Sequence, residues 1–117
     1  MTDRLVGLDI EEQGDVVIAR VTGELDIAEA TSTGDAIAEA TPSSARALVV
    51  DFSELTFIDS SGIAMLFGLA RKLASRRQEM RVVAPSGEPV ARVLDLVDFD
   101  RAAPIHSDVD SAIAAIA

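Results

Sequence analysis

The tetrapeptide Asp59-Ser60-Ser61-Gly62 places two hydroxyl groups beside a carboxylate, at the start of a segment with helical periodicity. A serine hydroxyl acts as a catalytic nucleophile when a general base lies within hydrogen-bond reach. The only histidine, His106, lies in a poorly patterned segment, and no Gly-x-Ser-x-Gly nucleophile elbow surrounds Ser60. We therefore expect that the protein is not an enzyme and that the serines have a structural or binding role.

The remaining chemistry-bearing residues indicate neither a metal site nor a cofactor. The chain has no cysteine, its acids lack metal-ligand spacing, and it has no glycine-rich loop that ends in Lys-Ser or Lys-Thr. The formal net charge of -10 argues against nucleic acid and against an anionic membrane as partners. One basic cluster is interpreted as a solvated helix end, where cations complement the helix dipole: Arg71, Lys72, Arg76 and Arg77.

Length and hydropathy predict one small domain. A chain of 117 residues can bury a core without disulfides. No apolar run approaches the ~20 residues that a membrane span needs, and the N-terminal segment lacks the apolar block of a signal peptide. We expect residues 1–117 to form a single domain with a cytoplasmic location.

Strand patterns alternate with helix patterns along the chain. Residues 6–10 alternate apolar and polar, and residues 16–22 form a second strand after a Gln-Gly-Asp turn, which predicts an antiparallel hairpin. Ala47–Val50 is a continuous apolar run, typical of a strand that is covered on both faces. Residues 81–84 form a short strand, and Ile105 is assigned to a weak edge strand because Pro104 precedes it.

Four helices are predicted between and after these strands. The first is capped by Asp26 with Glu29 in a capping box, and the last is capped by Ser107. The strongest follows the serine motif, and the third opens around Pro89. The expected buried positions are Ile27, Ala30, Gly34 and Ile37; Ile63, Leu66, Phe67, Ala70, Leu73 and Ala74; Val90, Val93, Leu94 and Val97; and Val109, Ala112, Ile113 and Ile116.

The alternation predicts an α/β fold with a mixed, mostly parallel sheet of four to five strands, an antiparallel hairpin at one edge and about four helices. Functional loops of such folds lie at the carboxyl ends of the strands. Two loops stand out, at residues 23–26 and 57–62. If the strands that precede them are neighbours, both loops lie side by side on one rim.

These two loops carry a resemblance to a known family. Val21-Thr22-Gly23-Glu24-Leu25-Asp26 and, 33 residues after Asp26, Asp59-Ser60-Ser61-Gly62 resemble the motifs of bacterial anti-sigma factor antagonists of the STAS family. The segment Leu48–Leu55 resembles the strand and loop that lead into that family's serine, and the likeness spans essentially the whole chain. After the motif glycine the family often has Leu-Gly, whereas this chain has Ile63-Ala64.

The resemblance implies a binding protein and a STAS-like fold. In this family the antagonist binds an anti-sigma factor that is also a serine kinase, and this frees the sigma factor. The kinase phosphorylates the serine that follows the motif aspartate, Ser60 here, and a phosphatase removes the phosphate. STAS domains also serve as docking modules of transport or sensory complexes, which is the alternative function.

The physics of a helix start is compatible with this role of Ser60. A plain N-cap by Ser60, or equally by Ser61, is the structural alternative. A phosphate there meets free backbone N–H groups, so it acts on docking more than on folding. Asp26 is explained by its capping box, whereas Asp59 is expected to orient the serine or contact the kinase.

A helical wheel places Ser60, Ala64 and Gly68 at i+4 positions on one face, away from the predicted core stripe. Either a neighbouring helix of the domain packs there, or a partner docks along the face. The expected partner-binding residues are Asp26, Asp59, Ser60, Ser61, Gly62, Ala64 and Gly68.

Overall fold

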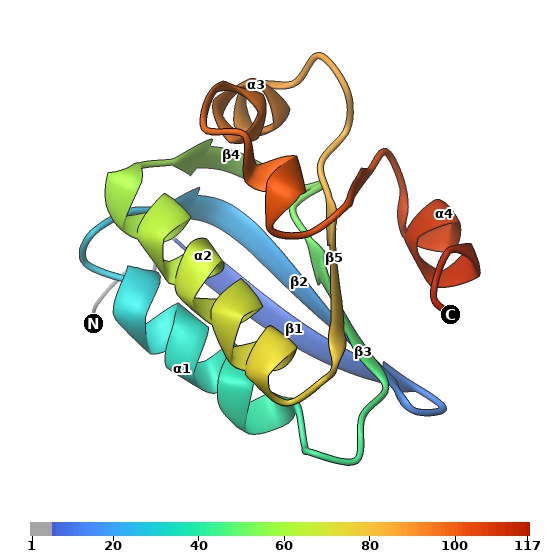
Figure 1. Cartoon of the computed structure of the whole chain (residues 1–117). Coiled ribbons are helices and arrows are strands. Elements are labelled where there is room, and N and C mark those ends of the chain that lie inside the picture. Colours follow the sequence, from blue (N-terminus) through green and yellow to red (C-terminus); the bar gives the residue numbers. More distant parts are fainter. Residues whose placement is uncertain (1–5) are drawn as a thin grey trace.

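A six-stranded sheet forms the centre of the computed structural model, which describes residues 6–117 (Figure 1). The strand order is β1-β2-β3-β5-β6, and β4 pairs with the end of β2. β1 and β2 are antiparallel, and the other pairs are parallel. The strands are β1 (Val6–Gln13), β2 (Val16–Leu25), β3 (Ala47–Asp51), β4 (Leu55–Ile58), β5 (Glu79–Val83) and β6 (Ile105–His106). The helices are α1 (Ala30–Ala40), α2 (Ser60–Ser75), α3 (Pro89–Leu96), a 3-10 turn (Phe99–Arg101) and α4 (Val109–Ala114).

The predicted α/β architecture is confirmed, including the hairpin at one edge and the short strand at Ile105. The sheet has one strand more than the four to five expected. This strand is β4, which has only four residues and pairs with the last residues of β2 beyond an irregularity at Gly23 and Glu24. A segment this short carries too little periodicity to be recognised in the sequence.

Helices cover both faces of the sheet. α1 and α2 lie side by side over one face, α3 lies above β4, and α4 lies on the opposite face (Figure 1). The larger apolar cluster packs between the sheet and α1, α2 and α3, and a smaller one packs under α4 around Ala112. β3 is buried along its whole length between the two clusters, as the apolar run Ala47–Val50 predicts.

The first helix begins later than expected. α1 starts at Ala30, and the predicted capping box does not form. Asp26 Oδ1 instead accepts a hydrogen bond from Ala28 N at 3.0 Å, which makes a local Asx-type turn before the helix. Ile27 lies in this turn and is 78% exposed, so its assignment to the buried face was wrong.

Three other expectations about helices are corrected. On α2, Leu69 is buried and Ala74 is exposed, because the buried face is centred on Leu66 and Leu73 and Ala74 lies about 80° from Leu66 at 100° per residue. Val97 follows the end of α3 and is 40% exposed. Asp108, not Ser107, caps α4, and its carboxylate accepts from Ser111 N at 2.7 Å.

Candidate functional site

The two predicted loops meet at one rim of the sheet. β2 and β4 are parallel neighbours, and Leu25 pairs with Ile58 where both strands end. The backbone N–H of Asp59 donates to the carbonyl of Leu25 at 3.2 Å, so the loop before α1 and the start of α2 lie side by side. We call the segments 23–29 and 54–62 the rim. The expectation that these loops are adjacent is confirmed.

The carboxylate of Asp59 joins the two halves of the rim. Oδ1 accepts from the backbone N–H groups of Ser61 and Gly62, at 2.9 and 3.1 Å. Oδ2 accepts from Ile27 N, 32 residues away in sequence, at 3.2 Å. Asp59 is therefore the N-cap of α2 and at the same time fixes the turn that precedes α1. The structural alternative that Ser60 is the N-cap is wrong.

Ser60 is the first residue of α2 and is exposed. Within residues 6–117 its hydroxyl makes no hydrogen bond, whereas the neighbouring N–H groups of Ser61 and Gly62 are already bonded to Asp59. The expectation that a phosphate on Ser60 meets free N–H groups therefore needs correction. A group attached to Ser60 Oγ either displaces the Asp59 carboxylate or projects into water.

Gly62 has a packing role in the motif. A Cβ at this position would lie 2.6 Å from Ile58 Cγ1 and 3.1 Å from the carbonyl oxygen of Leu25. Real Cβ atoms are not found so close to other heavy atoms. The missing side chain thus lets the first turn of α2 approach the ends of β2 and β4, which holds Ser60 at the rim.

The surface of the rim is acidic with exposed apolar groups. The segments 23–29 and 54–62 contain five carboxylate residues and no basic residue. Two large apolar side chains are exposed there, Ile27 at 78% and Phe57 at 46%. Sequence reasoning missed both as surface residues, because Ile27 fitted a helical stripe and Phe57 belongs to the unrecognised strand β4. Their position beside the motif was the available signal.

The face of α2 that begins at Ser60 is open. Ala64 is exposed, and a Cβ on Gly68 would meet only the Arg71 guanidinium, at 3.8 Å. The close helix contact lies elsewhere: a Cβ on Gly34 of α1 would lie 2.5 Å from Met65 Cγ. Among residues 6–117, no helix of the domain therefore packs directly on Ala64 and Gly68.

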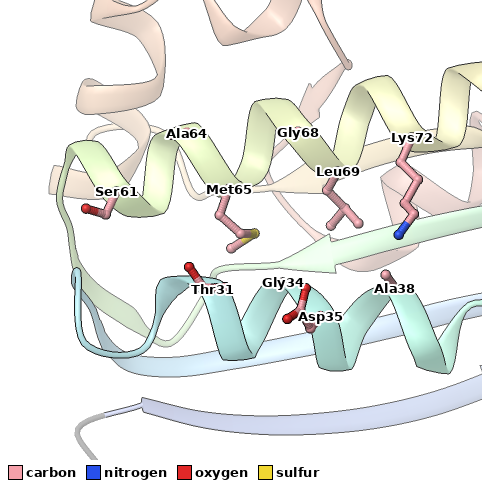
Figure 2. Close-up of a pocket in the computed structure, with 10 residues that line it drawn as sticks. All are labelled: Thr31, Gly34, Asp35, Ala38, Ser61, Ala64, Met65, Gly68, Leu69 and Lys72. Atoms are coloured by element: carbon pink, nitrogen blue, oxygen red, sulfur yellow. The ribbon is translucent and has the colours of Figure 1, made fainter.

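A groove of about 480 Å³ runs between α1 and α2 from the rim toward the end of α2 (Figure 2). Met65, Leu69 and Lys72 reach from α2 toward α1 in this groove. Its complete lining is Thr31, Gly34, Asp35, Ala38, Ser61, Ala64, Met65, Gly68, Leu69 and Lys72.

Other chemistry is absent from the part of the chain that the structure describes. No group of three or more histidine or acidic side chains there could hold a metal ion. No helix between residues 6 and 117 has the length and apolar character required to cross a bilayer. His106 Nε2 lies 3.1 Å from Arg81 Nη1, so this imidazole pairs with a guanidinium.

The fold and the rim define a small α/β domain that presents an exposed serine at a helix start. The STAS domain family profile matches residues 7–112, and the chain belongs to that family. The structure of an anti-sigma factor antagonist from Mycobacterium paratuberculosis superposes with a TM-score of 0.85 at 28% identity, over 95% of this chain and 93% of that one. This likeness agrees with the predicted STAS-like fold.

Two curated relatives extend the comparison. The anti-sigma-F factor antagonist RsfB of Mycobacterium tuberculosis is 24% identical over 111 residues, which cover 95% of this chain and 89% of RsfB. The low affinity sulfate transporter 3 of Stylosanthes hamata is 38% identical over 66 residues, or 55% of this chain. The matched segment makes up only 10% of that transporter.

Proposed function

We propose that the protein is an anti-sigma factor antagonist. It binds an anti-sigma factor that is a serine kinase, frees the sigma factor, and is inactivated when the kinase phosphorylates Ser60; a phosphatase restores it. The observation that carries the proposal is the exposed Ser60 hydroxyl, which has no hydrogen-bond partner within residues 6–117 although the helix start around it is fully capped. The antagonist relatives, each matched over 95% of this chain, support it.

Phosphorylation changes the charge of the rim more than its shape. A phosphate adds about −1.5 to −2 charges to a surface whose segments already carry carboxylates and no basic residue. Because Asp59 occupies the nearest N–H groups, the phosphate stays on the outer side of the rim. Like-charge repulsion at the interface needs to supply only about 1.4 kcal/mol for a tenfold loss of affinity.

The proposed docking surface combines the rim with the open face of α2. Ser60, Ser61, Ala64 and Gly68 lie along it, with Asp26 at the neighbouring loop. Asp59 and Gly62 support the surface through the contacts described above. The components act in the cytoplasm, where kinase and sigma factor meet.

Phosphotransfer tests the proposal directly. The protein is incubated with candidate anti-sigma factor kinases and ATP, and intact mass and peptide mapping locate the label. One phosphate on Ser60, lost in Ser60→Ala and retained in the neighbouring control Ser61→Ala, is the expected result. Label on Ser61 alone, or label retained in Ser60→Ala, contradicts the assignment of the phosphoacceptor.

Binding tests the switch. Ser60→Asp is expected to weaken kinase binding about tenfold with little change in melting temperature, because Ser60 is exposed and its side chain makes no hydrogen bond among residues 6–117. A large loss of thermal stability in this variant would mean that the added charge acts on the helix and not on the interface.

The alternative function is a docking module of a transport complex, and the 38% identity to part of a sulfate transporter favours it as the second candidate. The two functions predict different behaviour with kinases. A docking module binds its transport partner equally well with Ser60 or with Asp at this position, and no anti-sigma factor kinase labels it.

A further inference from the structure

The groove between α1 and α2 has charged walls of opposite sign at the end far from the rim. Asp35 and Glu39 are exposed on the α1 side, and Lys72 and Arg76 are exposed on the α2 side. Within residues 6–117 no nitrogen of the α2 pair lies within 4.0 Å of a carboxylate oxygen of the α1 pair. Both walls therefore present charges that are free to pair with a third body.

Between these walls and the rim, the floor of the groove is apolar and narrow. Leu69 is 5% exposed, and Met65 lies against Gly34, where any side chain on α1 would collide with it. Ser61 and Thr31 line the end of the groove nearest the rim. From Ser61 to Lys72 the groove follows about 16 Å of α2, the length of about three helical turns.

The walls also restrict what backbone can lie in the groove. Both are α-helices, so their own N–H and C=O groups are used within the helices and none forms a free strand edge. A segment that enters must satisfy its backbone hydrogen bonds internally. A helix does so, and helix-in-groove docking is a common mode of peptide recognition.

We infer that the α1–α2 groove receives an amphipathic helix of the anti-sigma factor kinase, an inference that rests on the proposed function and deepens it. This helix carries a basic side chain toward Asp35 and Glu39 and an acidic side chain toward Lys72 and Arg76. Its small apolar residues face Met65 and Leu69. The rim reads the phosphorylation state of Ser60, and the groove selects which kinase docks.

Charge reversal tests the selection. Asp35→Lys and Lys72→Glu change exposed residues, so both variants should fold as wild type. Each is expected to lower the affinity for the kinase that labels Ser60 about tenfold, because an attractive contact becomes repulsive. Glu12→Lys and Arg101→Glu are matched controls: they make the same charge changes at exposed positions away from the groove, and they should leave the affinity within about twofold.

The double variant Asp35→Lys/Lys72→Glu separates recognition by the groove from a pairing of the two side chains with each other and from an effect of the overall field. Its two charge changes cancel, so its net charge equals that of wild type. It is expected to bind at least as weakly as either single variant. Wild-type affinity in the double variant would mean that the two side chains merely pair with each other or act through the overall field, and this result would overturn the inference.

Nuclear magnetic resonance of the isotope-labelled wild-type protein with the same kinase then distinguishes failure of the groove from failure of the proposed function. Shifted amide signals at Gly34, Ala38 and Gly68 together with Ser61 support docking along the whole groove. Shifts confined to the rim refute the groove and leave the antagonist function intact. No shift at either place refutes both.

Discussion

Replacing Asp59 by alanine removes the acceptor of three backbone N–H groups, two at the start of α2 and one at Ile27. Loss of an N-cap costs about 1 kcal/mol, with a range of roughly 0.5 to 2. The N–H of Ile27 is exposed and can bond to water, so it adds little. We expect a total loss of about 1 to 2 kcal/mol. For a domain of this size that corresponds to a melting temperature lower by about 4 to 8 °C.

Asp59→Asn distinguishes a structural role of this residue from a chemical one. Asparagine is nearly as good an N-cap as aspartate, so the melting temperature should fall by less than half of the alanine effect. The rate of Ser60 labelling by the kinase should stay within about threefold of wild type. The assays are thermal unfolding by circular dichroism and initial rates of phosphotransfer.

Ser60→Ala is the stability control, because the Ser60 hydroxyl makes no hydrogen bond among residues 6–117 and should not affect melting. An unchanged melting temperature in Asp59→Ala would refute the capping role. An Asp59→Asn protein that melts like wild type but is no longer phosphorylated would mean that the carboxylate acts on the serine itself.

Three further outcomes follow from the packing and the caps. Gly62→Ala should destabilise the domain by about 1 to 3 kcal/mol in urea unfolding, because the new Cβ overlaps Ile58; an unchanged unfolding midpoint would contradict this. Leu66→Ala leaves a cavity beneath α2 and should cost about 2 to 5 kcal/mol by the same measurement, since Leu66 is fully buried. The hydrogen bond from Ser111 N lowers the pKa of Asp108, so its stabilisation is present above the ordinary aspartate pKa and is lost as the pH falls through the lowered value. Asp108→Ala should therefore be less stable than wild type at pH 6 and nearly equal to it at a pH below the lowered pKa, and a constant difference would refute the cap.

Features that depend on local periodicity could be predicted from the sequence. The apolar run of β3 and the spacing of Ile63, Leu66 and Leu73 identify a buried strand and an amphipathic helix without knowledge of their neighbours. The adjacency of the two loops also followed, because parallel strands end at the same edge of a sheet. These inferences place Ser60 at the rim.

Features that depend on tertiary contacts could not be predicted. The bond from Ile27 to Asp59 spans 32 residues, and no local pattern reports it. The exposure of Ile27 and Ala74 depends on where α1 begins and on how α2 is rotated against the sheet. The groove required the position of α1 relative to α2, so Asp35 and Lys72 looked like ordinary surface charges.

The double use of the Asp59 carboxylate has a consequence for the lifetime of the proposed phosphate mark. A phosphate seated in the N–H groups of a helix start is partly shielded, and its hydrolysis then depends on how often the helix end opens. Here Asp59 already holds those N–H groups, so the phosphoryl oxygens remain in water. A phosphatase can reach them without unfolding any part of the domain. The time for which the protein stays inactive is then set by the abundance of the phosphatase, and the cell can adjust it without any change in this chain.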